Sequence, residues 1–148
     1  MEFLSFTSNP IPMKSNKILF LTFLALFAFT GISLAQSTDS ATLVSVEKFE
    51  KMTKKKKKTV ILDVRTPQEV AEGHLAGAKN IDVQGDLFQV SIEQLDKNKT
   101  YLLYCRSGKR TAVAGAKMKA AGFKNVYMMD GGITSWKEKG KPLTNDKN

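Results

Sequence analysis

Residues 100–111, TYLLYCRSGKRT, decide the fold and place the chemistry. The first five form an apolar run with the length of a buried strand. Small and apolar residues fill the stretch from Lys109 to Ala121, which predicts a helix that ends near Gly122. Cys105 therefore lies between a buried strand and the start of a helix, which is where an α/β enzyme would carry a thiolate nucleophile.

Cys105 is the only cysteine of the chain. Three nearby cations, Arg106, Lys109 and Arg110, together with the helix N-terminus favour the thiolate form, so we expect partial ionisation at neutral pH. The alternative is a buried thiol that packs as a small hydrophobe. The flanking charges and Gly108 favour the reactive thiol over that alternative.

Outside this stretch, strand and helix signals alternate along the chain. Strands are predicted at 44–46, 60–64, 78–81 and 126–129, and helices at 47–52, 67–72, 91–95 and 133–138. Thr66 and Ser91 suit the N-caps of two of these helices. Short apolar strands separated by helices predict an α/β fold: a mostly parallel sheet of five strands with helices on both faces.

The N-terminal part of the chain has the composition of a leader. Residues 18–35 are uncharged and mostly apolar, follow two lysines, and end in the small residues Ser33 and Ala35. This pattern predicts a secretory signal peptide over residues 1–35, with Met13 as an alternative start. The protein is then expected to be exported, to the periplasm. The alternative is an uncleaved N-terminal membrane anchor.

The remaining residues suffice for one folded domain, which we place at 43–145 after a flexible lead-in at 36–42. Removing residues 1–35 takes away two lysines and one glutamate, so the net charge falls from +9 to +8. Lys54–Lys58 is a run of five lysines, which we interpret as a solvated loop; the alternative is a docking patch for an anionic lipid or polymer.

Several partners are not expected. Nucleic acid is not expected, because no aromatic residues interleave the lysines and an exported protein rarely meets it. One histidine and one cysteine cannot supply a closed zinc shell, so no metal site is predicted. No glycine-rich phosphate loop occurs, and no cofactor is predicted.

Four separated motifs span nearly all of the expected domain: residues 63–81 (DVRTPQEVAEGHLAGAKNI), 104–111 (YCRSGKRT), 122–126 (GFKNV) and 131–133 (GGI) with Trp136. In this order they resemble the signatures of the rhodanese family. Val70 stands where the family often has an aromatic residue, and Thr111 stands where a serine is common. Both departures affect packing or capping and leave the chemistry in place.

The resemblance implies a single rhodanese-like domain with sulfurtransferase activity. In that family the cysteine takes a sulfane sulfur from a small anionic donor such as thiosulfate, becomes a persulfide, and passes the sulfur to cyanide or a thiol. Cys105 is then the catalytic residue. The backbone N–H groups of the following loop would hold the persulfide, and its cations would attract the donor. This loop consists of Arg106, Ser107, Gly108, Lys109 and Arg110.

Four residues outside the loop are expected to support the site: Asp63, Arg65, Glu69 and His74. Asp63 and Arg65 would brace the edge of the sheet through a buried ion pair, and Arg65 with Glu69 is the pair that we predict. His74 is the only histidine, and we expect it in a structural turn rather than in a Cys–His pair.

Two other functions fit the sequence less well. A cysteine phosphatase of related fold carries an arginine six positions after its cysteine, whereas this chain has Thr111 there and Arg110 at five. The shorter loop fits a sulfur atom better than a phosphate group. The second is a non-enzymatic sulfur-binding or partner-docking module, which an intact loop with its cysteine disfavours.

Overall fold

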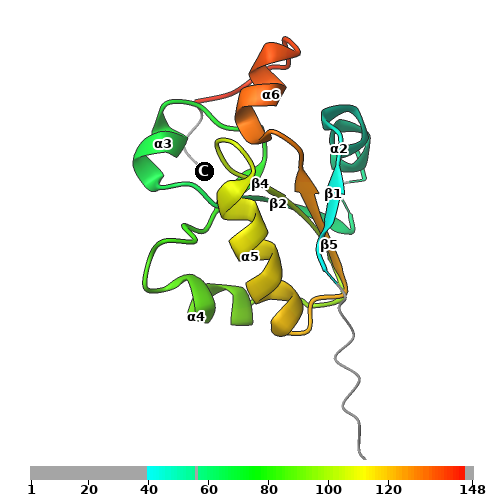
Figure 1. The fold of residues 1–148 in the computed structure, drawn as a ribbon, viewed down its shortest axis with the longest axis vertical. Coiled ribbons are helices and arrows are strands. Elements are labelled where there is room, and N and C mark those ends of the chain that lie inside the picture. The colour runs from blue at the N-terminus through cyan, green and yellow to red at the C-terminus, as the bar shows by residue number, and fades with distance from the viewer. Residues whose placement is uncertain (1–39, 56, 146–148) are drawn as a thin grey trace, which may run out of the picture. The chain divides into compact units, whose positions relative to one another are not determined.

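A computed structural model describes residues 40–55 and 57–145, and the expected signal peptide lies outside these residues. One parallel sheet has the strand order β1-β5-β4-β2-β3 (Figure 1). Its strands are β1 Thr42–Val44, β2 Thr59–Asp63, β3 Ala78–Asn80, β4 Thr100–Tyr104 and β5 Asn125–Met129. The predicted five-stranded α/β sheet is confirmed. No helix among the described residues is long and apolar enough to cross a membrane.

Helices cover both faces of the sheet (Figure 1). On one face, Leu102 of the central strand packs in a cluster with α2 (Val46–Thr53) and α6 (Gly132–Glu138). Its neighbour Leu103 points to the other face, because side chains alternate along a strand, and packs with α4 (Phe88–Glu93) and α5 (Lys109–Ala120). A fifth helix, α3 (Pro67–Ala71), buries no side chain of its own.

Two predicted elements were misplaced by two or more residues, for local reasons. The first strand begins at Thr42, inside the expected lead-in, and ends at Val44 because Ser45 caps α2: its Oγ accepts a hydrogen bond from Lys48 N–H at 3.4 Å. The helix predicted at 91–95 instead begins at Phe88, after Leu87, which makes no side-chain cap. Its start therefore gives no polar signal in the sequence.

The Thr66 cap was predicted correctly. Its hydroxyl accepts a hydrogen bond from Glu69 N–H, and the Glu69 carboxylate accepts one from Thr66 N–H, which makes a capping box. This reciprocal pair fixes α3 directly after β2.

The parallel arrangement collects functional segments at one edge. Because all strands run in the same direction, their carboxyl ends meet at the same edge of the sheet. Cys105 follows β4 there, Val64 and Arg65 follow β2, and Gly131 and Gly132 follow β5.

Candidate active site

The Cys105 thiol lies at the base of a tight loop. The residue is 1% exposed, and the Gly108 N–H donates a hydrogen bond to its Sγ at 3.1 Å. Gly108 has φ +98°, which glycine adopts without strain, and this turn brings its N–H toward the sulfur. The Gly108 carbonyl accepts hydrogen bonds from Thr111 Oγ1 at 2.6 Å and Ala112 N–H at 3.2 Å, which join the loop to α5.

The carbonyl groups of the loop are held from outside by the start of α6. Ile133 N–H donates to the Cys105 carbonyl at 2.8 Å, and Thr134 donates to the Arg106 carbonyl through its N–H at 3.1 Å and its Oγ1 at 3.0 Å. In a trans peptide the N–H points opposite to the C=O, so the N–H groups of Arg106 and Ser107 point away from α6.

Several N–H groups of the loop remain available to a ligand. Within the described part of the chain, no acceptor is found for the N–H groups of Arg106, Ser107, Lys109 and Arg110. The last two belong to the first turn of α5, where the helix itself offers no acceptor. Together with Gly108 N–H, they form the kind of donor set that binds an anion.

Gly132 permits the contact between the two loops. Its φ is +60°, and a Cβ at this position would lie 2.5 Å from the Cys105 carbonyl oxygen and 2.6 Å from that of Arg106. A side chain of any size would therefore push the cysteine loop away from α6. The sequence indicated a turn here but gave no sign that it touches the cysteine loop.

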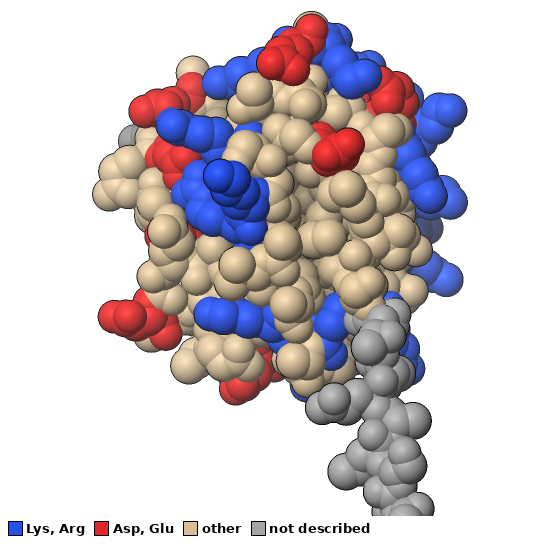
Figure 2. All heavy atoms as spheres, in the orientation of Figure 1, with Lys and Arg blue, Asp and Glu red and all other residues tan. Residues whose placement is uncertain are grey.

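Glu69 binds two of the three loop cations. Its carboxylate accepts hydrogen bonds from the Arg110 guanidinium at 2.5 and 2.8 Å, and Arg106 Nε lies 3.3 Å away. The hydrogen bonds from Arg110 lower the pKa of Glu69 to about 2. Figure 2 shows basic side chains over the start of α5 with acidic ones beside them. The predicted ion pair between Arg65 and Glu69 was therefore wrong, because Glu69 pairs with the loop.

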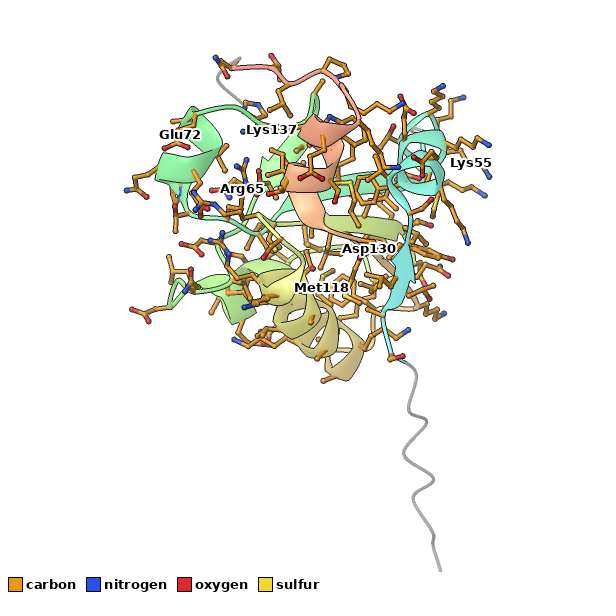
Figure 3. The ribbon with its side chains drawn as sticks, turned by 45° about the horizontal axis from the view of Figure 1, so that its top comes forward. Lys55, Arg65, Glu72, Met118, Asp130 and Lys137 are labelled. Atoms are coloured by element: carbon orange, nitrogen blue, oxygen red, sulfur yellow. The ribbon has the colours of Figure 1, made fainter. Side chains whose placement is uncertain are left out.

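Arg65 instead pairs with Asp63, and both side chains are buried. Arg65 Nε contacts the two carboxylate oxygens at 2.9 and 3.0 Å, and Nη2 contacts one at 2.5 Å. The guanidinium also donates to the backbone carbonyls of Glu69 at 3.2 Å and Gly73 at 2.9 Å. Figure 3 shows Arg65 beside α3. This pair ties the end of β2 to the middle of α3 and to the turn that follows it, and so fixes where Glu69 lies.

The other predicted site residues lie farther from the sulfur or face solvent. Ser107 and Lys109 are exposed on the loop. His74 is buried, with Nδ1 3.2 Å from the Val70 carbonyl, and it exchanges backbone hydrogen bonds with Thr144 at 2.9 and 2.8 Å. These contacts join the turn after α3 to the C-terminal segment.

Comparison with known proteins gives one family. The model of the rhodanese-like domain matches residues 45–139. A sulfurtransferase of Allochromatium vinosum is 31% identical over 84 residues, which are 57% of this chain and 77% of that protein. A tRNA uridine(34) hydroxylase of Yersinia pestis is 39% identical over 95 residues, but the match spans only 26% of that longer protein.

Solved structures share the fold. A rhodanese-related protein from Thermoplasma volcanium aligns with a TM-score of 0.61 and 28% identity, over 71% of this chain and 99% of that one. The polysulfide-sulfur transferase homodimer from Wolinella succinogenes aligns with a TM-score of 0.60 and 26% identity, over 73% and 81% of the two chains.

Proposed function

The chain belongs to the rhodanese-like domain family, and on this basis we propose that it is a sulfurtransferase in which Cys105 carries the transferred sulfur. The observation that carries the proposal is the position of Sγ at the base of a loop for whose N–H groups no other acceptor is found among the residues that the structure describes. A persulfide is an anion one atom longer than the thiolate, and these donors would stabilise its outer sulfur.

The proposed reaction has two steps. The Cys105 thiolate attacks the sulfane sulfur of thiosulfate, the S–S bond of the donor breaks, and sulfite leaves with its electron pair. The outer sulfur of the resulting persulfide is then attacked by cyanide, which gives thiocyanate and returns the thiolate. A thiol acceptor would leave as a persulfide by the same route.

The burial of Cys105 restricts what can react with it. With 1% of the residue exposed, a donor must present a narrow terminal atom to reach Sγ. A sulfane sulfur at the end of thiosulfate or of a polysulfide chain meets this requirement, whereas a tetrahedral phosphate group does not. Cysteine phosphatases carry an arginine six positions after the cysteine, and Arg110, at five positions, comes closest to it in this loop. Because Arg110 is bound to Glu69, a phosphatase is also disfavoured.

Intact-mass measurement tests the proposal. After incubation of the protein with thiosulfate, we expect a gain of one sulfur atom that disappears when cyanide is added. The Cys105→Ser variant should show no gain. A stable adduct that no acceptor removes would indicate the alternative, a sulfur-binding module without turnover. No adduct with thiosulfate or polysulfide would contradict both functions.

A further inference from the structure

The amino edge of the sheet, opposite the Cys105 edge, carries uncompensated positive charge. Three loops meet there, because they precede the parallel strands β2, β4 and β5. Within the described residues they contain one acid, Asp96, and the lysines 54, 55, 57, 58, 97, 99 and 124. No ion pair found among the described residues includes any of these lysines.

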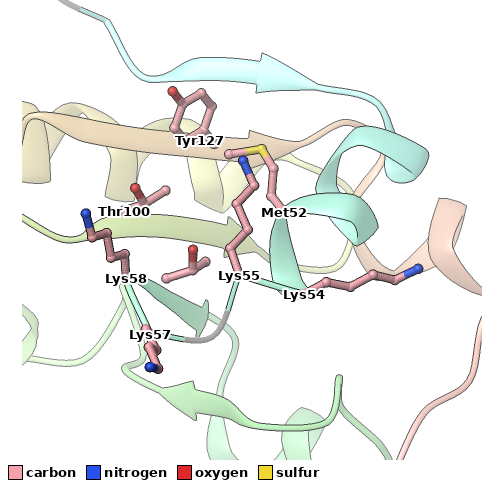
Figure 4. A pocket seen from close by; sticks show the side chains of 8 residues that line it. Met52, Lys54, Lys55, Lys57, Lys58, Thr100 and Tyr127 are labelled. Atoms are coloured by element: carbon pink, nitrogen blue, oxygen red, sulfur yellow. The ribbon is translucent and has the colours of Figure 1, made fainter.

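A cavity of about 660 Å³ opens at this edge. It exists because α2 ends at Thr53 and leaves the first rows of β2, β4 and β5 uncovered. Thr100 and Tyr127 form its floor, and Met52, Lys55 and Lys58 stand around it (Figure 4). Thr59 also lines it. We call it the lysine pocket. Its lining combines ammonium groups, hydroxyl groups and an apolar surface, and none of the described residues that line it carries a carboxylate.

The nearest carboxylates on α2 are occupied elsewhere. Glu47 pairs with Lys139 at 2.5 Å, and Glu50 pairs with Lys141 at 2.7 Å. The hydrogen bond from Lys141 lowers the pKa of Glu50, and the charge of Lys54 adds a smaller effect of the same sign. Neither carboxylate of α2 therefore pairs with Lys55 or Lys58 of the pocket.

The chain also enters the domain beside this pocket. Thr42, at the start of β1, pairs in register with Tyr127 of the pocket floor. The apolar stretch of the sequence ends at Ala35, seven residues before Thr42, and seven residues span at most about 25 Å. While residues 1–35 are still attached, an apolar segment suited to a membrane thus precedes, by a short connection, the edge that carries the lysines.

We propose that the lysine pocket binds the phosphate of anionic phospholipids and docks this edge of the domain on a membrane surface. The lysines pair with headgroup phosphates, while Met52 and Tyr127 contact the less polar glycerol region. Cys105 lies five residues beyond Thr100 along β4, about 16 Å away, so the docked domain presents the cysteine loop to solvent. Figure 3 shows Lys55 and Arg65 on opposite sides of the domain.

Lysine acetylation of the full chain in lipid vesicles tests this inference. Vesicles of phosphatidylcholine alone and vesicles with one quarter phosphatidylglycerol are compared, and the acetylation rate of each lysine is read by peptide mass spectrometry. We expect Lys55, Lys57 and Lys58 to react at least fivefold more slowly with the anionic vesicles. Lys137, on α6 and outside the pocket, serves as an internal control and should react at one rate in both.

Matched variants separate this pocket from general attraction. Lys55→Gln/Lys58→Gln should remove most of the protection of Lys57, because each lysine contributes about fivefold to binding an anionic surface. Lys48→Gln/Lys137→Gln makes the same charge change outside the pocket, and this variant should retain the protection of Lys57. The proposal would be overturned if the pocket lysines were acetylated at equal rates with both kinds of vesicle. It would also be overturned if both double variants lost the protection of Lys57 equally. Equal protection in phosphatidylcholine vesicles by tripolyphosphate or a short RNA would also overturn it, because the ligand would then be a soluble polyanion.

Discussion

Glu69 and Arg110, 41 residues apart in the chain, form a two-pronged ion pair across the mouth of the cysteine loop, with hydrogen bonds of 2.5 and 2.8 Å. Arg106 approaches the same carboxylate at 3.3 Å. One carboxylate therefore offsets part of the positive charge that would otherwise attract an anionic donor. The loop, whose cations were expected to attract an anionic donor, is thus less cationic than its sequence indicates.

Glu69→Gln should raise kcat/KM for thiosulfate about fivefold at low salt, because it returns the charge of both arginines to the donor. Glutamine retains the capping box of α3, so the helix should stay in place. The increase should be smaller for methanethiosulfonate, which carries one negative charge instead of two, and it should shrink at 0.5 M salt.

Glu72→Gln is the matched control for this prediction. Glu72 is exposed at the end of the same helix and takes part in no ion pair found among the described residues. Glu72→Gln should leave kcat/KM unchanged for both thiosulfate and methanethiosulfonate. Equal gains for the dianion and the monoanion with Glu69→Gln would show that electrostatic attraction is not the cause.

Gly132→Ala should lower sulfurtransfer at least tenfold, because its Cβ would collide with the Cys105 and Arg106 carbonyls. Gly140→Ala separates this collision from backbone strain: Gly140 has nearly the same φ, +63°, with no atom within 4 Å of the new Cβ. It should cost about 1 kcal/mol of unfolding free energy and keep the activity. Similar activity losses in both variants would contradict the role of the contact.

Asp63→Asn should destabilise the domain by about 3 kcal/mol, because it leaves the buried Arg65 guanidinium without its counter-charge. Urea unfolding at pH 7 measures the change. The exposed Asp86→Asn makes the same chemical substitution and should change stability by less than about 0.5 kcal/mol. A small effect of Asp63→Asn would mean that the pair contributes little.

The ion pair of Glu69 should also make stability depend on pH. The pKa of Glu69 is about 2 in the folded protein, below its ordinary value of 4.5. A lowered pKa contributes stability that is complete above about pH 5 and is lost as the pH falls toward 2. As the pH falls from 5 toward 2, the free energy of unfolding should decrease in both proteins. The decrease should be smaller by on the order of 1 kcal/mol in Glu69→Gln than in the unchanged protein.

Export is proposed from the sequence and can be tested directly. Residues 1–35 have the composition of a signal peptide, so the N-terminal residue of the protein recovered from the periplasm should be Gln36. A protein that keeps residues 18–35 and sediments with membranes would support the anchor instead.

Local signals in the sequence predicted most of the fold. The capping box at Thr66, the apolar run before Cys105 and the glycine at 108 each depend on neighbours within a few residues, and the structure has them. The Arg65 pair was mistaken because Glu69 lies one helical turn away, whereas Asp63 and Arg65, two residues apart, turn to the same side. Long-range contacts, such as that of Glu69 with Arg110, produce no periodic pattern in the sequence from which they could be predicted.

The hydrogen bonds from α6 to the cysteine loop have a consequence for biosynthesis. The Cys105 and Arg106 carbonyls acquire these partners only after Ile133 and Thr134 have been synthesised. Until then the nascent chain carries a thiol whose loop is held from one side alone. A translocated or newly made chain should therefore be most susceptible to oxidation at Cys105 in the interval before α6 docks against the cysteine loop. The rate at which α6 docks then helps to determine how much active protein is obtained.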